Sequence, residues 1–293
     1  MTGPAFTCIG GGHGLSATLR AARDVAATIT AVVSAADDGG SSGRLRRDLG
    51  IVPPGDLRRC LSALADPDLP LALALEHRFG SGDLAGHALG NLLLAGLIDH
   101  GLPVEEALVE LGRMVGARGT VLPASTEPVT LTGLSPGERP VEGQVSVQSA
   151  GCVRRVGIRP ADPPTPAAVG RALAEADLIA LGPGSLLTSV LAAAVVPGVA
   201  SALRATSAVR VLVLNLGPQV GETDGLGPDD HVRLVREHDV AFDVVLADPR
   251  FAPSDVGPAE LVVRPVGAGH GPVHDPALLG PALVDLVTGR PGA

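Results

Sequence analysis

Three amino acids are missing from this chain of 293 residues, which contains no lysine, no tyrosine and no tryptophan. All 22 basic residues are therefore arginines. The absence of lysine excludes a Walker-type phosphate loop and a Schiff-base enzyme, because each needs a lysine side chain. Without tyrosine and tryptophan, a nucleobase can pack only against four phenylalanines, arginine planes or aliphatic side chains.

Charge and cysteine content narrow the class of protein further. The formal net charge of -9 argues against nucleic acid as a partner, because nucleic-acid binders usually carry a basic face. The chain has three cysteines that lie far apart in the sequence, Cys8, Cys60 and Cys152. An odd number of distant cysteines is typical of reduced thiols in a cytosol. The first residues lack the basic and apolar regions of an export signal. The sequence therefore predicts a cytoplasmic protein.

One uncharged stretch raises the alternative of a membrane span. Residues 178–203 contain no charged side chain and are long enough to cross a bilayer. However, Gly182, Pro183, Gly184 and Pro197 interrupt the stretch, and a spanning helix needs an unbroken run. A buried strand, a turn and a buried helix are the better interpretation, so we predict no membrane span.

Short apolar runs alternate with helical segments along the chain. Strands are expected at 5–9, 29–35, 177–181, 209–215, 244–246 and 261–266, and helices near 15–24, 57–66, 70–79, 88–100, 104–117 and 276–288. Continuous apolar runs are typical of parallel strands that are covered on both faces. We therefore expect an α/β fold with a Rossmann-like, doubly wound, mostly parallel sheet.

Two regions depart from this alternation. A helical insertion is expected at about 57–118, and short strands and turns follow at about 119–166, where 144–148 and 153–158 are predicted to pair as a β-hairpin. We expect both regions to belong to one domain that covers residues 1–293.

The first glycine-rich motif, GGGHG, follows the first expected strand. Gly11, Gly12 and His13 lie where glycines allow the backbone to approach an oxygen-rich ligand, and the next helix offers its first amides to an anion. Leu15 occupies the last glycine position of a dinucleotide fingerprint, so that motif is broken. A tight structural turn remains the alternative to a ligand loop.

A second motif, DDGGSSGRLR, follows the second expected strand. Asp37 and Asp38 can ligate Mg²⁺ or accept ribose hydroxyl groups, and Ser41, Ser42 and Arg44 can contact phosphates. The alternative is a pair of solvated turn acids. The density of acid, glycine, hydroxyl and arginine favours a ligand loop.

Two further motifs lie at expected helix starts. Asp56 in PPGDLR either caps the following helix or joins Asp38 at a metal ion. His87 and Asn91 in GHALGNL stand at the start of an apolar helix, where a histidine is either structural or part of a binding site.

The motif GPGSLLTS follows an apolar strand. Gly184, Ser185 and Thr188 would present backbone and hydroxyl donors to a phosphate. A serine-hydrolase elbow is excluded because Pro183 and Leu187 stand where G-x-S-x-G needs glycines.

The last polar motif follows the strand expected at 209–215. It contains Asn215, Glu222 and Thr223. His231 and His238 come later on one helix face, without the H-E-x-x-H pattern, and we interpret them as surface residues. Because ligands bind beyond the carboxyl ends of strands in such sheets, we expect these motifs to converge on one cleft.

In this order, the motifs resemble the YvcK/CofD-like family on its gluconeogenesis-factor side. The resemblance spans about residues 6 to 240, and the DDGGSSGRLR and PPGD pair is its most specific part. It implies a CofD-like fold in a cytoplasmic bacterial protein. The YvcK branch is associated with binding nucleotide sugars of the UDP-N-acetylglucosamine type and with linking carbon metabolism to cell-wall synthesis and cell shape. The CofD branch instead uses Mg²⁺ to transfer a phospholactyl group from a guanosine diphospho-donor to a deazaflavin.

The resemblance also implies roles for single residues. Carried over by motif, the metal-binding acids are Asp38 and Asp56, the phosphate cradle is Gly11, Gly12, Gly184 and Ser185, and the nucleotide or sugar pocket contains Asn215 and Thr223. Three features depart from the family pattern. His13 replaces the usual threonine, Arg59 replaces the expected asparagine, and the TQPGET motif is loosened to PQVGET at residues 218–223. The C-terminal third is short and rich in glycine and proline, so the resemblance places no base or sugar contacts there.

Two functions follow from the resemblance, and we favour the first. It is a non-catalytic regulator that binds a UDP-sugar, forms a homodimer and acts on an unidentified protein partner. It requires no cofactor, and Mg²⁺ is an optional one. Its pyrophosphate would lie on glycine-loop amides and Arg44. The second is a Mg²⁺-dependent transferase of the 2-phospho-L-lactate type, with Asp38 and Asp56 on the ion. The sequence leaves open the base, the sugar and the role of segment 241–293.

Overall fold

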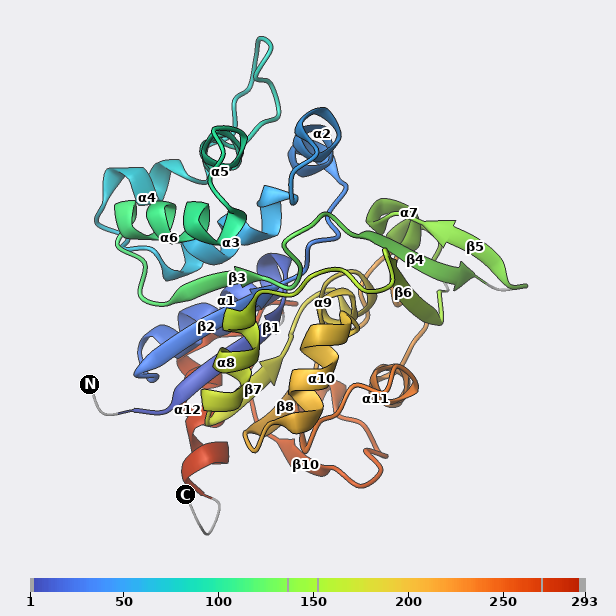
Figure 1. Cartoon of the computed structure of the whole chain (residues 1–293). Coiled ribbons are helices and arrows are strands. Elements are labelled where there is room, and N and C mark those ends of the chain that lie inside the picture. The colour runs from blue at the N-terminus through green and yellow to red at the C-terminus, as the bar shows by residue number, and fades with distance from the viewer. Residues whose placement is uncertain (1–2, 136, 152, 270, 290–293) are drawn as a thin grey trace.

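A seven-stranded sheet forms the centre of the computed structural model, which describes residues 3–135, 137–151, 153–269 and 271–289 (Figure 1). The strand order is β10-β9-β8-β7-β1-β2-β3, and every pair is parallel. The strands are β1 (Ala5–Gly10), β2 (Thr28–Val33), β3 (Thr120–Pro123), β7 (Leu178–Leu181), β8 (Val209–Val213), β9 (Val244–Ala247) and β10 (Glu260–Val263). The predicted doubly wound, mostly parallel α/β fold is confirmed.

Helices cover both faces of this sheet. Helices α1 (Gly12–Arg23) and α12 (Pro276–Thr288) lie on one face, and α8 (Ala167–Glu175) and α10 (Pro197–Ala205) lie on the other (Figure 1). The sheet is therefore buried between two helical layers, which explains why its strands have continuous apolar runs.

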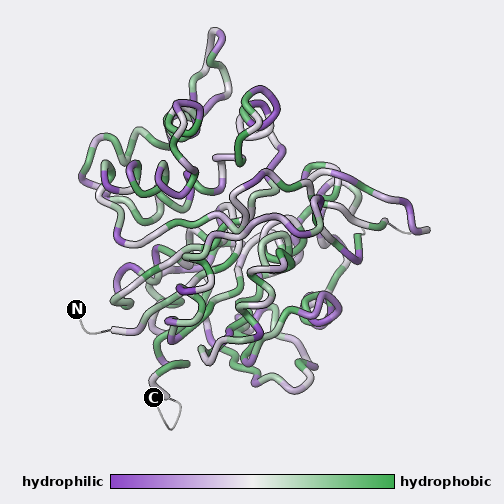
Figure 2. Tube along the Cα trace, in the orientation of Figure 1, coloured by the Kyte–Doolittle hydropathy of each residue, from purple (hydrophilic) through white to green (hydrophobic). Residues whose placement is uncertain are grey.

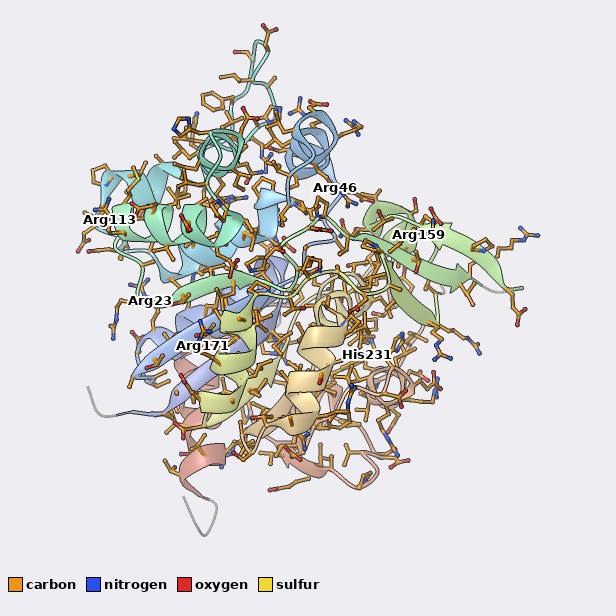
Figure 3. The ribbon with its side chains drawn as sticks, viewed as in Figure 1. Arg23, Arg46, Arg113, Arg159, Arg171 and His231 are labelled. Atoms are coloured by element: carbon orange, nitrogen blue, oxygen red, sulfur yellow. The ribbon has the colours of Figure 1, made fainter. Side chains whose placement is uncertain are left out.

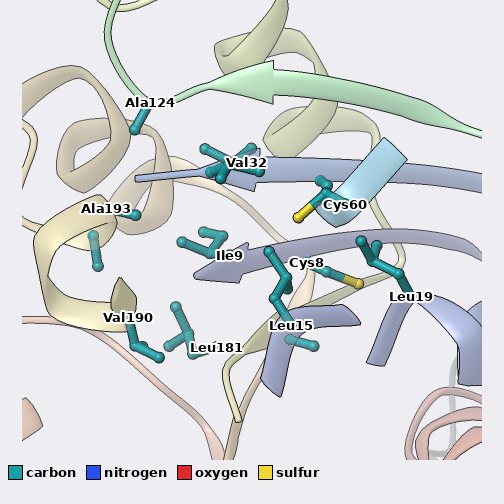
Figure 4. Packing of buried hydrophobic residues seen from close by; sticks show 14 of the residues in the cluster. Cys8, Ile9, Leu15, Leu19, Val32, Cys60, Ala124, Leu181, Val190 and Ala193 are labelled. Atoms are coloured by element: carbon teal, nitrogen blue, oxygen red, sulfur yellow. The ribbon is translucent and has the colours of Figure 1, made fainter. Parts of the chain in front are cut away.

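The core between the layers is built from aliphatic side chains. On α1, the buried residues Leu15, Thr18, Leu19 and Ala22 follow the i, i+3, i+4, i+7 spacing of one helix face. They pack with fully buried strand residues such as Ile9 (Figure 4). Each fully buried leucine or isoleucine contributes roughly 1.5–3 kcal/mol. Figure 2 shows hydrophobic residues along the central strands and hydrophilic residues along α2 (Gly40–Leu49).

The expected helical insertion lies between β2 and β3, above one edge of the sheet (Figure 1). It contains α2, α3 (Pro54–Leu64), α4 (Pro70–Ala74), α5 (Leu89–Asp99) and α6 (Val104–Met114). Helix α4 is shorter than the predicted 70–79, because the following loop folds back and Arg78 bridges Ala88.

The predicted hairpin of 144–148 with 153–158 is wrong. A second, antiparallel sheet has the order β5-β4-β6, with β4 (Thr130–Ser135), β5 (Arg139–Glu142) and β6 (Arg155–Arg159). Residues Gln144–Ser149 form helix α7 instead of a strand. The carboxylate of Asp38 accepts hydrogen bonds from the amides of Gln144 and Val145 and thereby caps this helix from 106 residues away.

The uncharged stretch 178–203 is a strand followed by a bent pair of helical segments. After β7, the π-helical η1 (Leu186–Leu191) continues into α9 (Ala192–Ala194), and α10 follows at an angle of 72°. Among the described residues, no single helix is long and apolar enough to cross a membrane, although this bent pair passes a test of length and composition. Its residues from Leu186 to Ala194 are all buried in the core.

Of the two histidines interpreted as surface residues, His231 is buried and His238 is half-buried. They lie in and just after α11 (Pro228–Glu237), near η2 (Pro249–Phe251). His231, labelled in Figure 3, is 1% exposed and packs edge-on against Phe251. His238 Nδ1 donates to the Leu234 carbonyl, so its Nε2 accepts the Val156 amide hydrogen at 2.8 Å. That interpretation failed because the apolar face of α11 includes position 231.

The structure places two of the three cysteines and several surface arginines. Cys8 and Cys60 are free and buried, and burial raises the pKa of the Cys8 thiol to about 12. Cys152 lies outside the described residues. The labelled arginines come from separate elements, Arg23 from α1, Arg113 from α6 and Arg159 from β6 (Figure 3). The absence of a nucleic-acid partner stays a prediction.

Candidate functional site

The candidate site lies at the carboxyl ends of β1 and β7, where the chain order of the sheet reverses. Two cavities adjoin there, with volumes of about 200 Å³ and about 460 Å³. Both are lined by His13, Gly14, Gln148, Gly184, Ser185 and Gln219. Together they offer the concave space that a small-molecule ligand requires.

The first turn of α1 faces the smaller cavity. Gly12 has a φ of +64°, which favours glycine, and a side chain at Gly14 would overlap the backbone of Gly184. Within the described ranges, the amides of Gly12, His13 and Gly14 donate no hydrogen bond to the protein. A 12-residue helix therefore presents free amides and the positive end of its dipole to the cavity.

Two carboxylates face each other beside this helix start. Asp37 and Asp56 both line the smaller cavity, and Asp56 is 7% exposed. Burial, and then repulsion from Asp37, raise the pKa of Asp56 to about 6. Arg59 Nη1 lies 2.9 Å from Asp56 Oδ1 and supplies a positive charge at the same place. A side chain at position 55 would crowd the site, because a Cβ there would overlap Ser42 Oγ and would lie 2.7 Å from Asp37 Oδ2.

Asp38 lies elsewhere, although it was predicted to share a metal with Asp56. Its two carboxylate oxygens accept the amides of Gln144 and Val145, at 2.9 and 3.0 Å. It does not line either cavity in the part of the chain that the structure describes. The structure thus brings Asp37, rather than Asp38, next to Asp56.

The loop after β7 is held by side chains of the last polar motif. Asn215 Oδ1 accepts the Gly184 amide at 2.9 Å, and its Nδ2 donates to the Gly184 carbonyl at 2.8 Å. Gln219 Oε1 accepts the Leu186 amide at 3.2 Å. These two side chains border the larger cavity, but both polar atoms of Asn215 and the Oε1 of Gln219 are used by the protein.

Glu222 completes this arrangement at the start of η1. Its buried carboxylate accepts the amides of Leu187 and Thr188, at 2.5 and 3.4 Å, and the Thr188 hydroxyl at 2.9 Å. Burial raises the pKa of Glu222, although these hydrogen bonds oppose the shift. Thr223 Oγ1 accepts the Gln219 amide at 2.8 Å. The backbone amides after Ser185 are therefore occupied by the protein, unlike those of α1.

Three other predicted site residues form a chain of hydrogen bonds. Arg58 Nε donates to Asn91 Oδ1 at 3.2 Å, and Asn91 Nδ2 donates to Ser41 Oγ at 3.0 Å. Ser41 Oγ also forms a hydrogen bond with His87 Nδ1, at 3.0 Å. Arg58 is itself buried and pairs with Glu76. This chain ties α2 to α3 and α5.

The remaining predicted residues have structural contacts. Arg44 Nη2 donates to the Ala85 carbonyl at 2.8 Å, and the Ser42 hydroxyl lies against Gly55. Seven of the predicted site residues do not line either cavity in the part of the chain that the structure describes, namely Ser41, Ser42, Arg44, His87, Asn91, Thr188 and Thr223. Their predicted contact with a ligand is untested.

The cavities also contain residues that the motifs did not indicate. From the helical and small-sheet regions, these are Arg59, Gln144 and Gln148, and from the C-terminal segment Pro272, Val273 and His274. The sequence could have indicated Arg59, since it departs from the family pattern beside Asp56. It contained no such indication for the other residues, because they reach the site only through long-range folding.

Comparisons with known proteins agree with this architecture. The family model described as 2-phospho-L-lactate transferase CofD matches residues 6–258. The chain is 46% identical to a putative gluconeogenesis factor of Mycobacterium tuberculosis, over 97% of this chain and 90% of that protein. It is 38% identical to the gluconeogenesis factor of Bacillus subtilis, over 86% of this chain and 81% of that protein. A crystal structure of a UPF0052 family member from Bacillus halodurans superimposes with a TM-score of 0.90 at 34% identity, covering 97% and 99% of the two chains.

Proposed function

The chain belongs to the CofD family, and we propose that it is a cytoplasmic regulatory protein that binds a nucleotide sugar of the UDP-N-acetylglucosamine type. The observation that carries this proposal is the first turn of α1, whose free amides face a polar cavity beside Arg59. Free amides at a helix N-terminus favour an anionic group, and a pyrophosphate is the anion that nucleotide sugars share.

A divalent cation fits the same cavity. Mg²⁺ is usually held by one or two carboxylates together with substrate phosphates and water. Asp37 and Asp56 offer two such carboxylates, whereas no cluster of three or more suitable side chains occurs in the described ranges. A bound ion would offset the charge of the diphosphate and relieve the repulsion between the two acids.

The names of the relatives support a role in carbon metabolism. We extend the proposal to a link between gluconeogenesis and cell-wall synthesis and cell shape, exerted as a homodimer on a protein partner. A strain that lacks the protein should grow poorly on a non-sugar carbon source. The wild-type gene should restore growth, and Asp56→Asn should not. Full rescue by Asp56→Asn would separate the cavity from the regulatory role.

Calorimetry with UDP-N-acetylglucosamine tests the binding step. At about 100 μM protein, we expect a measurable heat of binding, and we expect the affinity to increase when Mg²⁺ is present. The double variant Asp37→Asn with Asp56→Asn should lose the Mg²⁺ dependence, whereas Asp83→Asn, in an exposed loop, is the matched control. Binding that is absent up to millimolar ligand, with and without Mg²⁺, would refute the proposal.

A Mg²⁺-dependent transferase is the second candidate, and the Asp37–Asp56 pair favours it. A cation on these acids would stabilise the leaving phosphate of a nucleoside-diphosphate donor. Phosphorus NMR of UDP- and GDP-linked donors, mixed with a deazaflavin acceptor and followed over hours, tests this activity. Breakdown that requires Mg²⁺ and disappears in Asp56→Asn would favour the transferase over the regulator. Binding of an intact donor that stays unchanged would favour the regulator.

A further inference from the structure

The two cavities differ in chemistry. The smaller one is bordered by polar side chains, namely Asp37, Asp56, Arg59, Gln144, Gln148 and Ser189. The larger one is bordered mostly by aliphatic side chains, namely Ala17, Leu216, Pro218, Val220, Pro272 and Val273. Because the cavities adjoin at His13 and Gly184, a single elongated ligand can occupy both.

Most polar side chains beside the larger cavity are already satisfied. Asn215 and Gln219 hold the backbone of the loop after β7, and Glu222 holds the start of η1. His274 Nε2 donates to the Leu214 carbonyl at 3.1 Å. Away from His13, Gln148 and Ser185, which also line the smaller cavity, a group in this cavity therefore meets mostly aliphatic surface and backbone atoms.

Two valines on this wall are unusually exposed. Val220 and Val273 are 87% and 60% exposed, respectively. Covering such side chains is favourable, whereas a sugar placed between them would leave its hydroxyl groups without partners. A planar base has two apolar faces and few polar edge atoms, so it suits this wall better than a sugar does.

The C-terminal segment supplies part of the wall, through Pro272, Val273 and His274. Gly267 bridges His274, and the hydrogen bond of His274 to Leu214 holds this turn at the carboxyl end of β8. Val273 thereby lines the same cavity as Val220. This assigns a role to a part of segment 241–293 that no motif explained.

The polar cavity offers what a sugar needs. Gln144 and Gln148 come from α7, and the polar atoms of their side chains have no hydrogen bond among the described residues. Amide side chains can donate and accept, so they match the hydroxyl and acetamido groups of an amino sugar.

We infer that the ligand lies with its base between Val220 and Val273, its diphosphate on the first turn of α1, and its sugar beside Gln144 and Gln148. This inference rests on the proposed nucleotide-sugar function and adds the orientation. The valines then determine affinity for the nucleoside, and α7 determines selectivity for the sugar.

Fragments and matched variants test the orientation. UMP, N-acetylglucosamine 1-phosphate and UDP-N-acetylglucosamine are titrated with Mg²⁺ into the wild type, Val273→Ser and Gln144→Ala. Val273→Ser should weaken the binding of UMP and of UDP-N-acetylglucosamine by about tenfold and leave the affinity for N-acetylglucosamine 1-phosphate unchanged. Gln144→Ala should weaken the sugar phosphate and leave UMP unchanged. The opposite pattern would overturn the orientation while the nucleotide-sugar function stands.

Whole ligands provide a second measurement if the fragments bind weakly. Gln144→Ala should reduce the preference for UDP-N-acetylglucosamine over UDP-glucose, whereas Val273→Ser should weaken both ligands equally. If Val273→Ser alone changes this preference, the orientation is wrong. If neither ligand binds the wild type, the proposed function fails and the orientation with it. Thermal unfolding of each variant checks folding, which an exposed valine should hardly affect.

Discussion

Asp56→Asn should stabilise the folded protein at neutral pH. Burial and the neighbouring Asp37 raise the pKa of Asp56 from 3.8 to about 6. A carboxyl group with a raised folded-state pKa holds its proton more tightly in the folded chain, so stability falls as the pH rises from about 4 to about 6. A difference of about two pKa units corresponds to about 3 kcal/mol above that range. Asparagine removes this cost but also the ion pair with Arg59, so we expect a gain of about 1–3 kcal/mol.

Urea unfolding at about pH 8 and about pH 4 measures this gain. The free energy of unfolding of Asp56→Asn should exceed that of the wild type at the higher pH, and the difference should fall below about 1 kcal/mol at the lower pH. Asp38→Asn is the matched control, because Asp38 caps α7. Its replacement should cost about 1 kcal/mol. If Asp56→Asn is less stable than the wild type at about pH 8, the charge repulsion inferred for the cavity is wrong.

Three further variants test other parts of the structure. Burial lowers the pKa of His231 from 6.5 to about 4, so stability is lost as the pH falls through this range, because only the unfolded chain takes up the proton. In urea unfolding, the free energy of unfolding of the wild type should fall by about 2 kcal/mol more than that of His231→Leu between pH 7 and pH 5. His100→Leu, at an exposed position, is the control. If the wild type and His231→Leu lose the same free energy, the burial of His231 is contradicted. Glu222→Ala should lower the free energy of unfolding by about 2–4 kcal/mol, because it leaves backbone amides buried without an acceptor. A change below about 0.5 kcal/mol would show that water replaces the carboxylate as the acceptor. His87→Leu should lower the free energy of unfolding by about 1–3 kcal/mol, because Ser41 loses its hydrogen-bond partner. His87→Asn keeps a hydrogen-bonding group there and should recover part of this loss. If the two variants are equally stable, the hydrogen-bond chain is refuted.

The central sheet was predictable because its signals are local. Continuous apolar runs at 5–9 and 209–215 became β1 and β8, and the start of α12 coincides with the predicted position 276. Such runs identify buried parallel strands without knowledge of their neighbours. The order of the strands, by contrast, was not predicted from the sequence, because it depends on which strands pair in the folded chain.

Elements that depend on distant partners were not predictable. Residues 144–148 have strand-like composition, but they form α7 because Asp38 caps it. In the same way, position 231 has the sequence of an exposed helix start, yet η2 covers it through Phe251. Both errors arise where one long-range contact outweighs local propensity.

The candidate site shows the same limit at the level of single groups. The motifs correctly placed glycines and acids near the carboxyl ends of β1, β2 and β7, but they did not distinguish Asp37 from Asp38. The two acids are neighbours in sequence, and one faces the cavity while the other faces α7. Only the packing of α7 against the loop separates their roles.

The two glycine-rich loops illustrate why this distinction matters for function. GGGHG and GPGS both follow a buried strand and both precede a helical segment, so each pattern alone predicts an anion site. After β7, however, the protein supplies its own acceptors, because Gln219 and Glu222 take the amides that a phosphate would need. After β1, the amides stay free and Arg59 stands beside them. A chain without lysine thus keeps one set of backbone donors for its ligand by satisfying the other set internally.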